Sequence, residues 1–337
     1  MNYRKLFIHT LIILLGVSCK PVEKLANKPL YRDPVFDGAA DPVVIWNSQA
    51  RKYFMYYTNR RANLEGAGGV SWVHGTRIGI AESKDGGASW TYLDTCDIGY
   101  RPDPGYTFWA PDVIEHEGLY HMYLTYVPGI FNDWSHPRDI IHLTSEDGIS
   151  WVYRSTLELA SDKVIDASIF RLPDSNWRMW YNNERDKKSM YYADSPDLYT
   201  WHNIGKTKGI QRGEGAKVFY WKDRYWMLVD EWKGLAVYYT EDLTNWNRQS
   251  ENILQEPGTG PDDMVIGGHC DVVVQGDRAY VFYFTHPGRR AEIPDSETVE
   301  KRRSTIQVAE LQLKDGKMEC DRNAPVHINL ERKRDLK

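Results

Sequence analysis

Cysteine is scarce in this chain, with four residues in 337, at positions 19, 96, 270 and 320. No two of them form a C-x-x-C pair, which argues against a zinc site built from cysteine pairs. Cys19 lies in the N-terminal segment, so three cysteines remain for the folded domain. This odd and widely spaced set excludes a disulfide framework, although it leaves room for a single disulfide whose partners the sequence does not assign.

A basic stripe and a long apolar run are also missing. Lys and Arg number 42 and Asp and Glu number 47, which gives a net charge of −5 and argues against a nucleic-acid partner. The apolar run at residues 6–17 is too short for a stable transmembrane helix. After residue 30 there is little helical periodicity, so the sequence predicts a protein made almost entirely of β-strands.

The N-terminus has the pattern of an export signal. Arg4 and Lys5 precede the short apolar run, and small residues then lead to Cys19. This pattern is similar to a bacterial lipoprotein signal, with a plain signal peptide as the alternative. We therefore expect a signal peptide at residues 1–19 with Cys19 lipidated, a linker at 20–30, and an exported periplasmic or outer-membrane lipoprotein that contacts the membrane only through its lipid anchor.

What the chain does contain in excess is aromatic side chains, with 13 Trp and 22 Tyr. Two interpretations remain open. Flat indole and phenol faces can stack on sugar rings, and aromatic residues also pack well between β-strands. The position of these residues in the fold decides between the two.

An internal repeat predicts the architecture. The segments SKDGGASW (83–90), SEDGISW (145–151), SPDLYTW (195–201) and TEDLTNW (240–246) share Ser or Thr, then Asp, then a turn that ends in Trp. Ser and Asp oxygens can accept hydrogen bonds from the N–H groups of a turn, and Trp can cover the base of a hairpin. Strand-like runs precede each such turn, and a fifth unit over residues 270–313 has the strands without the Trp turn.

Five units of about four strands fit radial repetition better than a sandwich, because blades leave only short edges exposed. We expect an all-β fold, a five-bladed β-propeller with four-stranded antiparallel blades around a central axis. The predicted catalytic domain covers residues 31–320, followed by a C-terminal tail at 321–337. We expect a monomer.

Each unit begins with a carboxylate just before or inside its first strand. The five are Asp41, Asp112, Asp166, Glu214 and Asp271. A single Asp at the start of a strand usually caps a turn, but a propeller would bring five such residues together at one end of its axis. Carboxylates held together in a partly dry site raise one another's pKa, which yields a protonated acid beside an ionised base.

These segments resemble the five-bladed propeller glycoside hydrolases of family 43, with families 117 and 32 as relatives. The matching pieces are ADP at 40–42, WAPDV at 109–113, IDAS at 165–168, EG at 214–215 and GH at 268–269. The chain departs from the family 43 pattern at Ala167 and Ala216, where that family usually has proline, and at Gly213, where family 117 has histidine.

The resemblance implies roles for three carboxylates. Asp41 is expected to be the general base, Glu214 the general acid, and Asp166 the residue that orients the acid and adjusts its pKa. Glu231 is a weaker rival for the acid. The resemblance also places His269 near a structural calcium ion or a water cluster on the axis. Because Ca²⁺ prefers oxygen ligands, His269 would contact the ion through water. We expect that the activity requires no cofactor.

Further residues are candidates for binding an oligosaccharide substrate. Trp109 precedes the second carboxylate and is either a stacking platform or part of the core. Polar groups after strands face substrate or solvent, and arginine can hold an anionic sugar through two hydrogen bonds. The full set of expected substrate-binding residues is Trp109, Asp112, Arg60, Asn182, Arg185 and His269.

The sequence thus predicts an inverting, exo-acting glycoside hydrolase for a plant or algal oligosaccharide, with arabinofuranosidase-, xylosidase- or galactosidase-like activity. Three alternatives stay open. A glycoside phosphorylase would hold phosphate where the attacking water lies, and a carbohydrate-binding lipoprotein would keep the propeller without catalysis. A sialidase would use the S-x-D-x-G-x-x-W box, which only residues 83–90 match in full.

Overall fold

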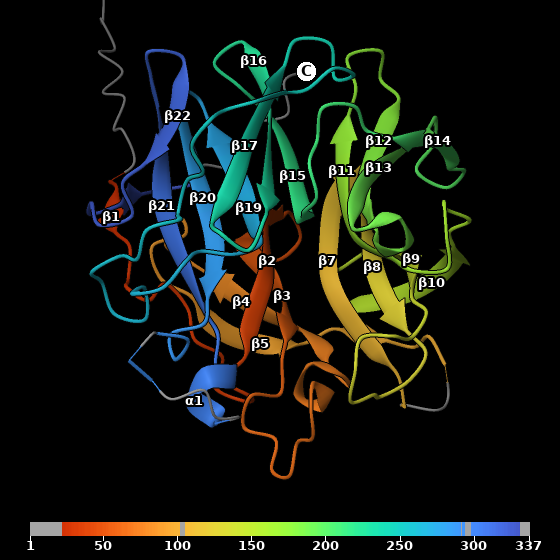
Figure 1. Ribbon diagram of the computed structural model, residues 1–337, viewed down its shortest axis with the longest axis horizontal. Helices are drawn as coiled ribbons and strands as arrows, with labels where there is room; N and C mark the ends of the chain where they lie inside the picture. Colours follow the sequence, from red (N-terminus) through yellow and green to blue (C-terminus); the bar gives the residue numbers. More distant parts are fainter. Residues whose placement is uncertain (1–21, 102–104, 291, 294–297, 331–337) are drawn as a thin grey trace, which may run out of the picture.

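The computed structural model describes residues 22–101, 105–290, 292–293 and 298–330, so the expected signal peptide lies outside the described residues. Five antiparallel sheets stand around a common axis, and the predicted five-bladed β-propeller is confirmed (Figure 1). Over the described ranges no helix is long and apolar enough to cross a membrane. The three cysteines in the described part, Cys96, Cys270 and Cys320, are free thiols.

The blades follow one another along the chain. Blade 1 contains β2 (Ala39–Asn47), β3 (Lys52–Asn59), β4 (Arg77–Ser83) and β5 (Thr91–Thr95). Blade 2 contains β7 (Thr107–His116), β8 (Leu119–Val127), β9 (Asp139–Ser145) and β10 (Ser150–Thr156), with the short β6 (Asp97–Ile98) added to its outer edge. Blade 3 contains β11 (Val164–Arg171), β12 (Trp177–Asn183), β13 (Ser189–Ser195) and β14 (His202–Lys206).

The last two blades have the same order. Blade 4 contains β15 (Glu214–Trp221), β16 (Arg224–Asp230), β17 (Leu235–Thr240) and β18 (Asn247–Arg248). Blade 5 contains β19 (Cys270–Gln275), β20 (Arg278–Thr285), β21 (Thr305–Lys314) and β22 (Lys317–Cys320). The charged segment before β21 includes the four-residue helix α1 (Val299–Arg302).

The first strand of every blade lies on the inside of the ring. Strands β2, β7, β11, β15 and β19 pack against one another in that cyclic order. Apolar and aromatic side chains fill the five spaces between neighbouring blades, including the fully buried Trp180 and Trp226. Most of the aromatic excess therefore packs strands. The consequence for function is that residues at the start of each first strand meet at one end of the axis.

The repeated turns have the predicted hydrogen bonds. In the first, Oγ of Ser83 accepts from the N–H of Gly87, and Oδ1 of Asp85 accepts from the N–H of Ser89. The indole of Trp90 donates to the carbonyl of Gly87 and is buried. The polar residues of the motif thus satisfy the turn backbone, and the Trp closes the hairpin base.

The two ends of the described chain close the ring between blades 5 and 1. Strand β1 (Lys24–Leu25) pairs with β23 (His327–Ile328), and Tyr31 exchanges two backbone hydrogen bonds with Ile306 of β21. Leu30 and Leu330 are both buried. The described parts of the expected linker (20–30) and tail (321–337) therefore belong to the packed domain, because their apolar side chains cover the joint between the first and last blades.

Candidate active site

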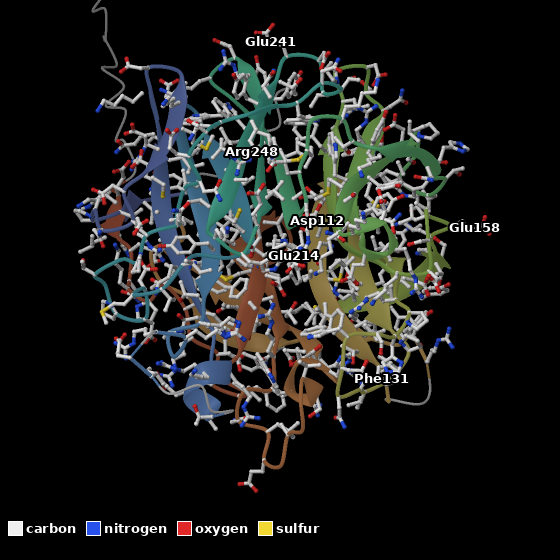
Figure 2. The ribbon with its side chains drawn as sticks, in the orientation of Figure 1. Asp112, Phe131, Glu158, Glu214, Glu241 and Arg248 are labelled. Atoms are coloured by element: carbon white, nitrogen blue, oxygen red, sulfur yellow. The ribbon has the colours of Figure 1, made fainter. Side chains whose placement is uncertain are left out.

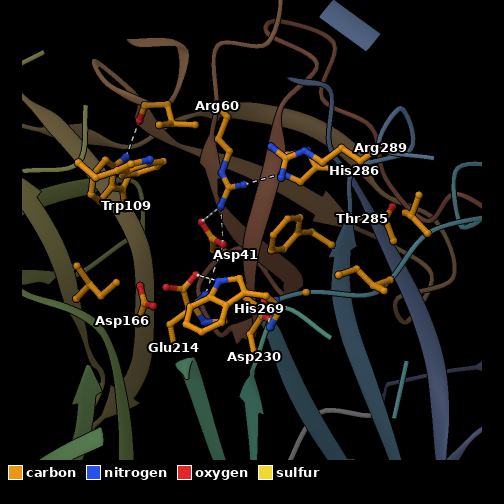
Figure 3. Close-up of a pocket in the computed structure, with 18 of the residues that line it drawn as sticks. Asp41, Arg60, Trp109, Asp166, Glu214, Asp230, His269, Thr285, His286 and Arg289 are labelled. Atoms are coloured by element: carbon orange, nitrogen blue, oxygen red, sulfur yellow. Dashed lines mark hydrogen bonds and ion pairs between the residues drawn. The ribbon is translucent and has the colours of Figure 1, made fainter. Parts of the chain in front are cut away.

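A cavity of about 1050 Å³ opens at the end of the axis where the first strands begin. Asp41, Asp166 and Glu214 come from blades 1, 3 and 4 and all line it, as Figure 3 shows. Trp72, Trp109 and Trp134 line the cavity from the side of blades 1 and 2. The three expected catalytic carboxylates therefore share one cavity with an aromatic wall.

A backbone irregularity presents these carboxylates. The pairing of the first and second strands shifts register in blades 1 to 4, which marks a β-bulge in each. One bulge residue per blade has a positive φ, namely Asp41 (53°), Ala110 (43°), Asp166 (59°) and Gly215 (59°). Left-handed backbone is costly for residues with a side chain, and such strain gathers at functional sites. The bulges direct Asp41 and Asp166 into the cavity, and Glu214 lies one position earlier in its blade.

Asp41 is held as an anion. Its two oxygens accept hydrogen bonds from Nη2 of Arg60 over 3.1 and 3.2 Å, and Nδ1 of His269 lies 3.4 Å from Oδ1. Burial alone would raise the pKa of Asp41, but Arg60 and His269 together hold it well below its usual range. Burial lowers the pKa of His269, but the carboxylates of Asp41 and Asp166 outweigh burial and raise this pKa to about 9. Asp41 is thus ionised and ready to accept a proton.

Arg60 is itself fixed in place by a neighbour that the sequence did not single out. Nη1 of Arg60 lies 3.0 Å from Nε2 of His286, and Nδ1 of His286 lies 2.9 Å from the carbonyl of Arg303. The carbonyl can only accept, so Nδ1 carries the proton and Nε2 accepts from the guanidinium. Burial lowers the pKa of His286 well below its ordinary value, which agrees with a neutral ring. His286 therefore aims Arg60 at Asp41.

Asp166 has the opposite electrostatic environment. Its carboxylate is buried and accepts the N–H of Gly215 over 3.0 Å, which links blades 3 and 4. Burial raises the pKa of Asp166 to about 7, with Glu214 and Asp41 adding to the rise and His269 opposing it. Near neutral pH Asp166 is therefore partly protonated, beside the other two carboxylates.

Glu214 is oriented by two hydrogen bonds from blades 3 and 4. Nζ of Lys188 donates to Oε2, and the indole N–H of Trp232 donates to Oε1 over 3.0 Å. Burial lowers the pKa of Lys188, but Glu214 and Glu184 outweigh that and raise it. Trp232 itself has φ of 58° and is about two-fifths exposed at the cavity. The expected acid is therefore positioned by partners that follow the second strands of their blades.

Asp230, at the end of β16, connects these groups. Its Oδ1 accepts the backbone N–H of Trp232 over 2.7 Å and its Oδ2 accepts that of His269 over 2.9 Å. Burial and then Glu214 raise the pKa of Asp230 to about 7. It lines the cavity between blades 4 and 5 and holds the segments that carry Trp232 and His269.

The structure corrects the expectation that all five opening carboxylates converge in one site. Nζ of Lys217, on β15, lies 2.9 Å from Asp112 and 2.9 Å from Asp271. Asp112 and Asp271 are buried along the axis and accept backbone N–H groups of Ile169 and Val44 on the next blade. Ala110 occupies the bulge position that Asp41 has in blade 1, and Asp112 comes two residues later, at the position of Lys217 in blade 4. Asp112 therefore faces the axial lysine and lies outside the set that lines the cavity. Figure 2 shows Asp112 and Glu214 near the centre of the molecule.

Of the other expected substrate-binding residues, three line the cavity and two lie outside its lining. Arg60, Trp109 and His269 line the cavity. Trp109 is buried, donates its indole N–H to the carbonyl of Val73, and supports the more exposed Trp134. Asn182 and Arg185 lie outside the cavity lining: Asn182 is buried and donates to the carbonyl of Gly213, and Arg185 is exposed and paired with Asp162.

The rival acid Glu231 is engaged elsewhere. It accepts hydrogen bonds from the hydroxyl of Tyr238 over 2.9 Å and from Arg248 over 2.7 Å. It does not belong to the described residues that line the cavity. The geometry therefore favours Glu214 over Glu231 as the group that meets a substrate.

The residues on the axis do not fit a calcium site. Calcium prefers several oxygen ligands, whereas Asp112 and Asp271 are already neutralised by the ammonium group of Lys217. His269 directs Nδ1 to Asp41. Within the described ranges there is no group of three or more His, Cys, Asp or Glu side chains arranged to hold a metal ion. The contacts of His269 are those of a residue that positions Asp41, the expected general base.

Several cavity residues escaped the sequence analysis. Lys188 and Trp232 follow the second strands of blades 3 and 4, and Asp230 ends the second strand of blade 4. Trp134 and Arg138 lie in the loop before β9. Their signal was weak, because polar residues after a strand are common in any loop. The parallel with Arg60, which directly follows β3, is the pattern that could have found them.

Comparison with known proteins supports the fold. No family model matches the sequence. An uncharacterised protein of Mycobacterium tuberculosis is 26% identical over 165 residues, which cover 46% of this chain and 52% of that protein, so the chain spans about half the length of this curated relative. Solved structures match over far more of the chain, at identities that show the fold alone.

Three of those structures are glycoside hydrolases of family 43. A thermostable family 43 enzyme is 19% identical with a TM-score of 0.66 and coverage of 89% of this chain and 99% of its own. A β-xylosidase/α-arabinofuranosidase from a compost metagenome, in complex with xylotriose, is 16% identical with a TM-score of 0.61, and the match covers 84% of this chain and 94% of that one. A β-1,3-galactosidase bound to galactodeoxynojirimycin is 14% identical with a TM-score of 0.61, and the match covers 89% of this chain and 98% of that one. The close structural neighbours of this propeller are thus family 43 glycoside hydrolases.

Proposed function

We propose that this protein is an inverting glycoside hydrolase that removes a sugar from the end of an oligosaccharide. The observation that carries the proposal is the convergence of Asp41, Asp166 and Glu214 in one cavity, with one carboxylate held ionised and another with its pKa raised to about 7. General acid–base cleavage of a glycoside needs an ionised base and a second carboxyl group that delivers a proton, and Asp166, with its raised pKa, lies beside the proposed acid Glu214.

In the proposed reaction, water attacks the anomeric carbon from the face opposite the leaving group. Asp41 accepts a proton from this water, and Glu214 donates a proton to the glycosidic oxygen as the bond to it breaks. The products are the free sugar with inverted configuration and the shortened alcohol, and proton exchange with solvent restores both carboxyl groups. Asp166 helps by holding the backbone of Gly215, which follows Glu214.

The cavity and the structural neighbours support the proposed substrate class. The solved relatives include a β-xylosidase/α-arabinofuranosidase and a β-1,3-galactosidase. The cavity is bordered by indole faces, of which Trp134 and Trp232 are substantially exposed and suited to stacking on a sugar ring. We propose an arabinofuranoside, xyloside or galactoside of plant or algal origin, taken by its terminal residue.

Leaving-group chemistry tests the two roles separately. With an oligosaccharide, we expect Glu214→Gln and Asp41→Asn each to lower kcat by ~10³-fold. With a 2,4-dinitrophenyl glycoside, whose leaving group needs no proton, Glu214→Gln should recover most of its rate and Asp41→Asn should not. Glu231→Gln is the matched control. Equal losses of Glu214→Gln on both substrates would contradict its assignment as the acid.

The same assay addresses the alternatives. A phosphorylase would release sugar 1-phosphate only when inorganic phosphate is present, and a binding protein would retain affinity without turnover. We expect release of free sugar at a rate that does not depend on phosphate. We also propose that no metal is needed, so that dialysis against EDTA leaves the rate unchanged.

Export and anchoring remain proposals of their own. We propose that the protein is a monomeric lipoprotein of the periplasm or outer membrane, held by a lipid on Cys19. Replacement Cys19→Ala is expected to move the protein from the membrane fraction to the soluble fraction of cells. Unchanged fractionation would contradict the anchor without bearing on the activity.

A further inference from the structure

One wall of the cavity has more positive charge than its carboxylates can balance. Four cationic residues, Arg138, Lys163, Lys188 and Arg212, line the cavity from blades 2 to 4, and we call them the basic wall. Their carboxylate neighbours in the cavity are Glu184, Glu214 and the buried Asp166, whose pKa is raised to about 7. A wall of this kind can accept a further anion.

The carboxylates of the wall are already shared by two of the cations. Nε of Arg138 lies 2.7 Å from Oε2 of Glu184, and Nζ of Lys188 lies 3.3 Å from Oε1 of the same residue. Lys188 also donates to Glu214. Glu184 and Glu214 are therefore engaged by Arg138 and Lys188.

Lys163 and Arg212 are the surplus. Among the described residues neither forms an ion pair with a carboxylate. Arg212 is exposed and its guanidinium carbon lies 5.0 Å from the ring centre of Trp232, the residue that contacts Glu214. Lys163 is half-buried, and burial followed by the charge of Arg138 lowers its pKa. Both observations describe cations whose charge is not compensated within the fold.

The position of these unpaired cations relative to the expected acid indicates what they could bind. Lys188 touches the expected acid directly, and the backbone N–H of Gly213 donates to the carbonyl of Lys188, which places Arg212 beside it. Indole rings lie among these cations, since the guanidinium carbon of Arg138 lies 5.2 Å from the ring centre of Trp109 and Nζ of Lys188 lies 5.0 Å from that of Trp232. A sugar that stacks on these rings therefore lies next to the basic wall.

We propose that the basic wall binds an anionic substituent of the sugar substrate, through Lys163 and Arg212. The inference deepens the proposed function, since it names the chemical class of the substrate as an acidic sugar. A carboxylate of a uronic acid and a sulfate ester share the required chemistry, because both present oxygens to charge-assisted donors. The neutral sugars of the structural neighbours would lack this contact.

Binding of single sugars tests the proposal without relying on turnover. Isothermal titration at low and high NaCl would compare galacturonic acid and galactose 6-sulfate with galactose, and glucuronic acid with glucose. We expect at least one acidic sugar to bind ~10-fold more tightly than its neutral counterpart, about the value of one charge-assisted hydrogen bond. This preference should weaken at high salt. The tighter of the uronate and the sulfate identifies the substituent.

Variants locate the effect on the wall. Lys163→Gln and Arg212→Gln should each reduce the affinity for the acidic sugar by ~3–10-fold and leave the neutral sugar unchanged. Lys187→Gln is the matched control, because Lys187 is exposed, next to Lys188, and not among the residues that line the cavity. It should behave as the unmodified protein does.

Three outcomes would overturn the proposal. These are equal binding of acidic and neutral sugars, a preference that survives both substitutions, and inorganic phosphate binding as tightly as the acidic sugars. The hydrolase proposal fails in a different way: a protein that prefers acidic sugars but never cleaves a glycoside keeps the basic wall and loses the enzyme. Cleavage without any acidic preference gives the reverse result.

Discussion

The ammonium group of Lys217 lies 2.9 Å from Oδ1 of Asp112 on the propeller axis, where the side chain of Asp112 is buried and that of Lys217 is 15% exposed. Asp271 is equally close on the other side. Burial lowers the pKa of Lys217, but the two carboxylates outweigh it and raise the pKa above its ordinary value. This triad joins blades 2, 4 and 5 on the propeller axis, beside the strands whose ends carry the proposed catalytic carboxylates.

Replacing this lysine should destabilise the whole propeller. Lys217→Met leaves two buried carboxylates without a counter-charge, and removing one partner of a buried ion pair costs about 3–5 kcal/mol. Urea unfolding followed by tryptophan fluorescence would measure the loss. Lys206→Met, at an exposed pair with Asp186, is the control and should change stability by less than about 1 kcal/mol. Equal stability of both variants would contradict a structural role for the axial triad.

The acidic limit of activity should depend on Arg60. Because Arg60 lowers the pKa of Asp41, its removal in Arg60→Met raises that pKa, and the base becomes protonated at a higher pH. The acidic limb of the kcat/KM profile should therefore move to higher pH by about one unit, with a lower maximum. Arg61→Met, whose guanidinium donates to the carbonyl of Ser71 instead, is a neighbouring comparison. An acidic limb that stays in place in Arg60→Met would remove Arg60 from control of the base.

Acid catalysis should depend on Lys188. Its ammonium group donates to Oε2 of Glu214 and so orients the expected acid. Lys188→Met is expected to lower kcat with an oligosaccharide by ~10-fold and to have less effect with a 2,4-dinitrophenyl glycoside, because that leaving group needs no proton. The acidic limb of the kcat/KM profile should stay in place, because Lys188 does not contact Asp41. Equal losses on both substrates would contradict a role of Lys188 in positioning the acid.

The sequence predicted the features that repeat from blade to blade and missed the contacts that depend on how the blades pack. The strands, the Ser-x-Asp turns and the inward position of Asp41, Asp166 and Glu214 follow from the periodic pattern, because blades repeat at the level of the chain. In blade 2 the residue equivalent to Asp41 is Ala110, and aligning the units on their first carboxylate misplaces Asp112 by two residues. Lys188 and Trp232 were missed because their contacts with Glu214 depend on how blades 3 and 4 pack.

Asp166 links activity to stability. Its pKa is raised to about 7 in the folded protein, so it keeps a proton that the unfolded chain loses near pH 4. This group therefore stabilises the fold relatively at low pH, and that contribution is lost as pH rises from about 4 to about 7. Asp166→Asn avoids the loss and should be more stable by ~2 kcal/mol at pH 8, with a smaller gain at pH 5.

The same substitution should lower kcat by ~10²-fold, because the carboxylate that supports the acid is gone. Urea unfolding at the two pH values and steady-state kinetics would measure both effects. A variant that is less stable at pH 8 than at pH 5, relative to the unmodified protein, would contradict the raised pKa.

The measurement that bears most directly on the account is proton NMR of the anomer that is released first. If Asp41 activates water against a bond protonated by Glu214, each turnover is one displacement and the new sugar appears with inverted configuration before it mutarotates. The account predicts that inverted anomer in the earliest spectra. Appearance of the retained anomer would mean a covalent intermediate on a carboxylate and would contradict the role given to Asp41.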